Sequence, residues 1–128
     1  KPEFLSAIAQ LREKHNLLIL FDEVQSGFGR LGEMMAWRAY MPDLEPDGIS
    51  WAKSMGGGFP IGGFWVSDRL IDEKNTPLFT VLGPGSHGST YGGNPLACAA
   101  SAASSRWRTC RAQAVNKITH STTSIIAK

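Results

Sequence analysis

The chain has 128 residues, of which 42% are hydrophobic and 19% are charged, and its formal net charge is +2. This composition is typical of a globular domain, and the length allows one modest hydrophobic core but not two. No apolar run approaches the roughly 20 residues that span a bilayer, and two cysteines are too few for a disulfide framework. We therefore expect no membrane partner and a reducing, cytoplasmic location.

Charge is distributed unevenly along the chain. All eleven acidic residues lie in residues 1–103, whereas residues 104–128 hold five lysines and arginines and no acid. A basic segment can bind nucleic acid, but no groove-reading motif accompanies these charges, and we expect no nucleic-acid partner. We divide the chain into residues 1–103, which form a folded unit, and residues 104–128, an atypical basic tail with no assigned role.

The first elements predict an α/β fold. Residues 2–15 carry Pro2 in the first turn and apolar residues at helical spacing, which predicts a helix. Residues 17–21 form a continuous apolar run, typical of a strand that is buried on both faces. A helix followed by such a strand indicates a mostly parallel sheet with flanking helices. The opening of the chain, which lacks an initiator methionine, indicates the middle of a longer protein.

Two strand ends carry residues that could do chemistry. The chain becomes polar at Asp22, at the carboxyl end of the first strand, where parallel sheets gather their ligand sites. From position alone, Asp22 is equally a helix cap or a ligand group. A second strand, residues 49–52, leads directly into Lys53, and five glycines follow within residues 56–63. Such a glycine cluster indicates backbone conformations or close approaches that a Cβ atom would prevent.

The remaining elements are a third strand, a short helix, a loop and a final helix. Residues 64–66 are strand-like, and a short helix is plausible at residues 68–73. Residues 83–95 form a second glycine-rich loop, and Pro95 suits the first turn of a helix that reaches about residue 103. Beyond this point no apolar period assigns a structure.

A lysine beside a glycine-rich loop has several interpretations. A lone lysine is usually a surface residue, and a nucleotide phosphate loop places its lysine after the glycines, whereas Lys53 precedes them. His15 and His120 have no metal-ligand spacing around them, and we expect no metal.

Three ordered segments resemble the class-III aminotransferases, which are fold-type I pyridoxal phosphate enzymes. They are residues 20–30 (LFDEVQSGFGR), 52–62 (AKSMGGGFPIG) and 87–97 (HGSTYGGNPLA). The resemblance covers roughly residues 1–103, and chains of this family are considerably longer. It implies that residues 1–103 are a central part of the large domain that binds pyridoxal phosphate, and that the isolated chain lacks some of the cofactor contacts.

The resemblance implies roles for several residues. Lys53 would carry pyridoxal 5′-phosphate as a Schiff base and would later shuttle a proton. Asp22 would pair with the pyridine nitrogen and keep the ring protonated, as an electron sink requires. Val24 would pack on the ring face, because it lies two residues from Asp22 and would point to the same side of an extended chain. Gln25 would hydrogen-bond near the ring hydroxyl.

The resemblance also implies a subunit partner. Thr90, with Ser89 as the weaker choice, would contact the cofactor phosphate in the neighbouring subunit's site. We therefore expect a homodimer with shared active sites.

Within the family, the three segments are most similar to acetylornithine and ornithine aminotransferases. This similarity implies transfer of an amino group from acetylornithine, or an ornithine-like ω-amine donor, to 2-oxoglutarate, a step of arginine biosynthesis. A 4-aminobutyrate-type aminotransferase and an inactive remnant that serves only as a subunit-interaction domain remain as alternatives.

Overall fold

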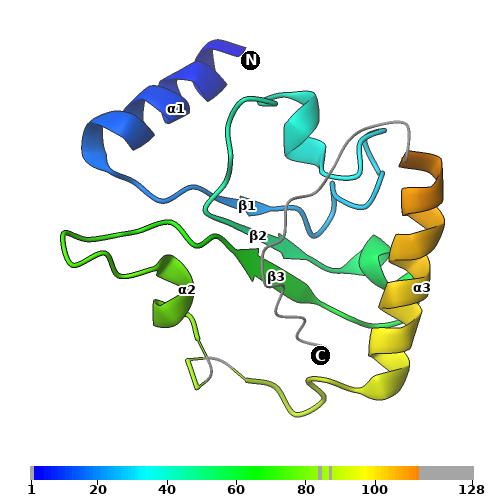
Figure 1. Cartoon of the computed structure of the whole chain (residues 1–128). Helices are drawn as coiled ribbons and strands as arrows, with labels where there is room; N and C mark the ends of the chain where they lie inside the picture. The colour runs from blue at the N-terminus through cyan, green and yellow to red at the C-terminus, as the bar shows by residue number, and fades with distance from the viewer. Residues whose placement is uncertain (1, 84, 87, 113–128) are drawn as a thin grey trace.

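The fold is α/β, as the sequence predicts, and three strands form a single sheet. The computed structural model describes residues 2–83, 85–86 and 88–112. The sheet order is β1-β2-β3, with bounds Leu20–Asp22, Gly48–Trp51 and Gly63–Val66. Helix α1 (Pro2–His15) lies near the start of β1, and helix α3 (Pro95–Ala112) lies at the opposite end of the sheet, beside the ends of β1 and β2 (Figure 1).

The described sheet contains one parallel and one antiparallel pair. Strands β1 and β2 are parallel, with Asp22 opposite Ser50. Strand β3 runs antiparallel to β2, whereas the sequence predicted mostly parallel pairing. The connection from β2 to β3 explains the difference. It holds only the short 3-10 helix η2 (Lys53–Gly56) and a glycine-rich turn, and a parallel return needs a crossover of about a dozen or more residues, usually a helix.

Helix α1 has the predicted bounds, but the strand after it is shorter and more exposed than predicted. Only Leu20–Asp22 pairs as a strand. Ile19 is buried, whereas Leu17, Leu18 and Leu20 are 47%, 42% and 63% exposed. The prediction of a strand buried on both faces is therefore wrong for the described residues. β1 is an edge strand of this sheet, and no described element covers its leucines.

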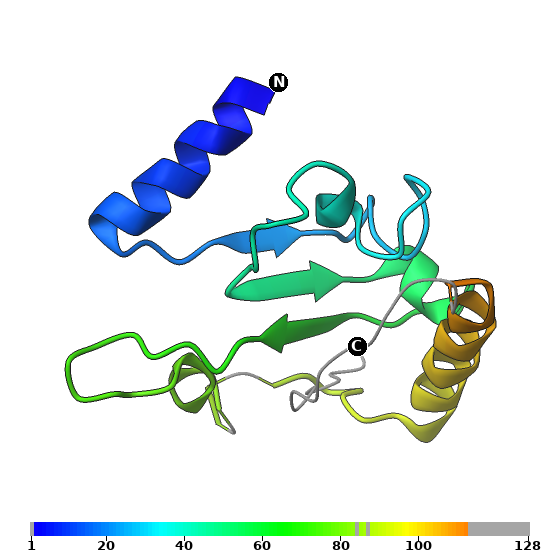
Figure 2. The same cartoon turned by 45° about the horizontal axis from the view of Figure 1, so that its top comes forward.

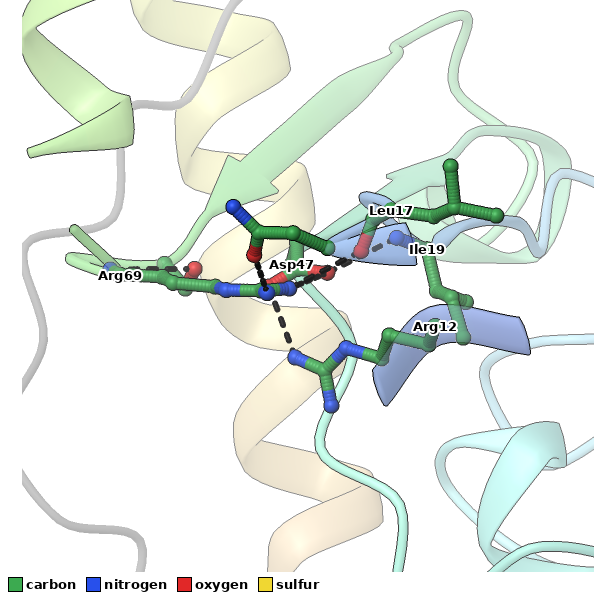
Figure 3. Close-up of polar contacts among 7 residues, drawn as sticks. Arg12, Leu17, Ile19, Asp47 and Arg69 are labelled. Atoms are coloured by element: carbon green, nitrogen blue, oxygen red, sulfur yellow. Dashed lines mark hydrogen bonds and ion pairs between the residues drawn. The ribbon is translucent and has the colours of Figure 1, made fainter. Parts of the chain in front are cut away.

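A buried aspartate joins the elements at the amino end of β2. Asp47 is 1% exposed, and its Oδ2 accepts a hydrogen bond from the backbone N–H of Ile19 at 2.8 Å. Arg12, in α1, donates from Nη2 to Asp47 Oδ1 at 2.9 Å (Figure 3). Arg69 follows β3, and its Nη1 lies 3.1 Å from Asp47 Oδ2. Arg69 also donates to the carbonyl of Leu17. One carboxylate thus ties α1 and all three strands together.

The core lies at the carboxyl end of β2. Its buried side chains come from the segment between β1 and β2, from β2, from η2 and the turn after it, and from α3. They are Phe28, Trp37, Ile49, Trp51, Met55, Ile61 and Ala97. The core therefore fixes the part of the chain around Lys53.

The segment after β3 is a turn, not the helix expected at residues 68–73. Leu70 forms an isolated antiparallel bridge with Pro77, and the Asp72 carboxylate accepts the N–H groups of Lys74 and Thr76 at 3.0 and 2.9 Å. Hydrogen bonds from Thr76, with Lys74 adding to them, lower the pKa of Asp72. Aspartate competes with helix formation in this way, because its short side chain bonds nearby backbone groups. A one-turn helix, α2 (Leu78–Val81), follows.

Helix α3 begins at Pro95, as predicted, and is capped by the residue before it. Asn94 Oδ1 accepts the N–H groups of Leu96 and Ala97 at 3.0 and 3.2 Å, a favoured N-cap arrangement. The helix continues to Ala112 and crosses the division proposed at residue 103. That division stays a prediction, and the tail beyond Ala112 lies outside the described residues.

Candidate functional site

Asp22 and Lys53 lie at the ends of neighbouring parallel strands. Asp22 is the last residue of β1, and Lys53 opens η2 two residues after β2 ends. Because β1 and β2 run the same way, both residues come to the end of the sheet that faces α3 (Figure 2). Ligand sites of α/β sheets gather at this edge.

The Asp22 carboxylate is exposed and held by two donors. Its Oδ1 accepts the N–H of Val24 at 3.0 Å and the hydroxyl of Ser50 at 3.2 Å. Ser50 is the residue opposite Asp22 in the parallel pair, so the two side chains lie on the same face of the sheet. Val24 lies in a turn, so the alternation of an extended chain does not place its side chain.

The backbone at Lys53 is left-handed. Its φ is 45°, in a region that residues other than glycine and asparagine seldom adopt. The Lys53 side chain is exposed. The turn is closed by a hydrogen bond of 2.9 Å from the N–H of Met55 to the carbonyl of Ala52, and Met55 is buried in the core. Gly57, with φ 60°, ends η2. Gly57 and Gly58, both with positive φ, belong to the glycine cluster that the sequence shows after Lys53.

Lys53 lines a surface hollow of about 750 Å³. Arg30 and Ser54 line it too, and Arg30 Nη2 donates to Ser54 Oγ at 3.2 Å. Asp22 lines a different hollow, of about 210 Å³, beside Trp37. The structure therefore brings Asp22 and Lys53 to adjacent strand ends but not into one hollow. Within the described part of the chain, no hydrogen bond or ion pair joins the two side chains.

The other predicted site residues lie on the surface. Gln25 is exposed in the turn after β1. Ser89 and Thr90 are exposed in the loop before α3, and neither lines the hollow of Lys53.

Glu23, the residue after Asp22, is buried and has a structural role. It is only 3% exposed. Its carboxylate accepts the N–H groups of Ala36 and Trp37 at 3.0 and 2.6 Å, which begin the 3-10 helix η1 (Ala36–Ala39). A carboxylate at a helix start satisfies amides that lack a partner within the helix. Its place directly after a strand is the only sequence signal for this role.

The described residues hold neither a metal-binding cluster nor a membrane-spanning helix. In residues 2–83, 85–86 and 88–112, no group of three or more His, Cys, Asp or Glu residues is arranged to hold a metal ion. None of the described helices is both long and apolar enough to cross a bilayer.

Comparison with known sequences identifies related proteins. The family model described as aminotransferase class-III matches residues 1–123. The acetylornithine aminotransferase of Vibrio parahaemolyticus is 49% identical over 98 residues, which are 77% of this chain and 22% of that protein. The chain thus spans about a fifth of the length of the curated relatives it matches.

Solved structures agree with the sequence comparison. The ornithine aminotransferase of Plasmodium yoelii superimposes with a TM-score of 0.71 at 32% identity, over 88% of this chain and 28% of that one. The taurine:2-oxoglutarate aminotransferase of Bifidobacterium kashiwanohense, solved in complex with PLP and glutamate, gives a TM-score of 0.67 at 34% identity. That match covers 85% of this chain and 23% of the other.

Proposed function

Because this chain belongs to the class-III aminotransferase family, we propose that it is the part of an acetylornithine aminotransferase that binds pyridoxal 5′-phosphate through Lys53. The proposed amino donor is acetylornithine and the proposed acceptor is 2-oxoglutarate. The identity of 49% to an acetylornithine aminotransferase supports the donor. The taurine:2-oxoglutarate relative, with its bound PLP, supports the acceptor class and the cofactor.

The observation that carries the proposal is the placement of an amine and a carboxylate at the ends of two adjacent parallel strands. Asp22 closes β1 and Lys53 follows β2. The donor set suits the cofactor: the Asp22 carboxylate can face a protonated ring nitrogen, and the Lys53 amine can react with an aldehyde. Lys53 lines a surface hollow of about 750 Å³ and Asp22 lines a separate one, so the proposal rests on the two strand ends and not on a shared hollow.

Each residue has a defined task in this proposal. Ser50 and the amide of Val24 hold Asp22 Oδ1 and leave Oδ2 available to a ring N–H. Lys53 Nζ would hold the cofactor until the donor's amino group takes its place. The released Lys53 amine would then be the base that takes a proton from the carbon bearing the donor's amino group. When bound, pyridoxal phosphate supplies the electron sink for that carbon.

Ser89 and Thr90 are proposed to act across a homodimer interface. Both side chains are exposed, and neither lines the hollow of Lys53 in the same chain. These positions fit a phosphate contact in a partner subunit's site better than one in their own. The oligomeric state at micromolar concentration, with and without pyridoxal phosphate, tests this part of the proposal.

Covalent labelling tests the cofactor lysine. The chain is mixed with pyridoxal phosphate, the adduct is fixed by borohydride, and the modified lysine is identified by peptide mapping. We expect modification at Lys53 and its loss in Lys53→Ala, with normal labelling in the matched control Lys74→Ala, which removes another exposed lysine. Labelling of Lys53→Ala at the wild-type level would refute the assignment. Adding acetylornithine, ornithine or 4-aminobutyrate to the loaded chain then ranks the donors.

A further inference from the structure

The loop after β1 contacts the Lys53 turn through one side-chain hydrogen bond. Arg30 Nη2 donates to Ser54 Oγ at 3.2 Å, across 24 residues of sequence, and both residues line the hollow of Lys53. We propose that Arg30, acting through Ser54, is a positioning residue that fixes the turn from which the Lys53 amine extends. This inference rests on the proposed function of Lys53.

The Lys53 turn requires support because its backbone is strained. A non-glycine residue with φ 45° persists only where the surrounding structure determines its conformation. On the core side, buried Met55 and its hydrogen bond to the carbonyl of Ala52 provide that support. On the side of the hollow, the bond from Arg30 holds Ser54, the residue directly after Lys53.

Arg30 can provide this support because its own backbone is anchored. Phe28, two residues earlier, is buried and meets the ring of Trp51 edge-on, with centroids 6.2 Å apart. The N–H of Phe28 also donates to the carbonyl of Met34 at 2.8 Å. Trp51 is the last residue of β2 and lies two residues before Lys53. The contact between Phe28 and Trp51 therefore holds the loop after β1 against the end of β2, and the hydrogen bond from Arg30 to Ser54 then fixes the turn that follows β2.

The positioning role differs in its expected effects from two other roles of Arg30, direct binding of a ligand anion and a purely structural role. A guanidinium that bound a ligand anion directly would act without Ser54. A purely structural arginine would change the folded fraction and leave the chemistry of the folded molecules unaltered. Loss of a positioning residue lowers the rate at which Lys53 bonds to the cofactor, and it does so only while Ser54 is present.

The test measures attachment of pyridoxal phosphate to Lys53 in the full chain. Rates are compared for wild type, Arg30→Ala, Ser54→Ala and the double variant, with borohydride fixation and peptide mapping. We expect each single variant to attach the cofactor roughly two- to tenfold more slowly, the range of one hydrogen bond, and the double variant to be no slower than either single one. Arg38→Ala is the matched control, because Arg38 is exposed, stacks on Trp37 and lines neither hollow.

Two companion measurements exclude a folding effect. Circular dichroism gives the folded fraction of each variant, and rates are expressed per folded molecule. Binding of pyridoxine 5′-phosphate, which has no aldehyde, should be equal in all variants, because positioning alters bond formation and not affinity.

The outcomes distinguish this inference from the function on which it rests. Wild-type rates in Arg30→Ala, a double variant slowed by the product of the single effects, or weaker pyridoxine phosphate binding would each overturn the positioning role while Lys53 keeps its function. If wild type itself attaches no cofactor at Lys53, the proposed function fails and this inference fails with it.

Discussion

Removal of the Asp47 carboxylate should destabilise the fold more than removal of an exposed aspartate. In Asp47→Ala, the N–H of Ile19 loses its 2.8 Å partner in a buried position, which costs about 1–3 kcal/mol. Arg12 and Arg69 lose their ion pairs as well. Their side chains are 15% and 24% exposed and can regain water, so each pair adds about 1 kcal/mol or less. Together these contributions give an expected loss of about 1–5 kcal/mol in the free energy of unfolding.

Urea unfolding followed by tryptophan fluorescence measures this loss by linear extrapolation. Asp43→Ala is the control, because Asp43 is exposed and should change the stability by no more than about 0.5 kcal/mol. Asp47→Asn keeps an oxygen for Ile19 and loses only the two ion pairs, so it should cost about 2 kcal/mol or less; it keeps the comparison possible if the alanine variant does not fold. The reasoning is refuted if Asp47→Ala and Asp43→Ala have equal stability.

Two further substitutions test the packing near the Lys53 turn and the capping of η1. A Cβ atom on buried Gly56 would lie 2.7 Å from Ile61 Cγ2, so Gly56→Ala should destabilise the chain by about 1–3 kcal/mol. The control Gly88→Ala, which has open space around the added Cβ atom, should leave the stability unchanged. Equal melting temperatures of the two variants would contradict this packing. Glu23→Ala leaves two amides at the start of η1 without an acceptor and should cost about 2–4 kcal/mol in urea unfolding. The exposed control Glu33→Ala should cost almost nothing, and a Glu23 variant as stable as this control would exclude the capping role.

Local sequence patterns predicted the elements that depend on local forces. The apolar period and Pro2 gave α1 its bounds, and Pro95 marked the start of α3. The expected helix at residues 68–73 failed because Asp72 closes a turn instead. The prediction that residues 17–21 are buried was wrong, because burial depends on which other elements pack against a strand. Apolar composition shows that a strand favours burial but does not show which element covers it.

The sequence predicted which residues of the candidate site end the strands, but not which residues hold them in place. The sequence placed Asp22 and Lys53 at the ends of two strands because polar residues follow apolar runs there. It did not identify Ser50 as the partner of Asp22, since that contact depends on the register of β1 against β2. Asp47 lies in a turn-rich segment where an acid is normally solvated. Its two arginines are 35 and 22 residues away, a separation that no local pattern spans.

The two ends of β2 have separate tasks in this fold. At the amino end, Asp47 precedes β2 and holds α1 and the strands together (Figure 3), whereas the turn of Lys53 follows the other end of the strand. At the carboxyl end, Arg30 donates a hydrogen bond to Ser54, the residue directly after Lys53. Asp47→Asn should therefore lower the free energy of unfolding and leave the attachment rate per folded molecule unchanged. Arg30→Ala should lower the attachment rate per folded molecule and leave the free energy of unfolding almost unchanged. An exposed hydrogen bond contributes little to stability but can determine where a nearby amine points.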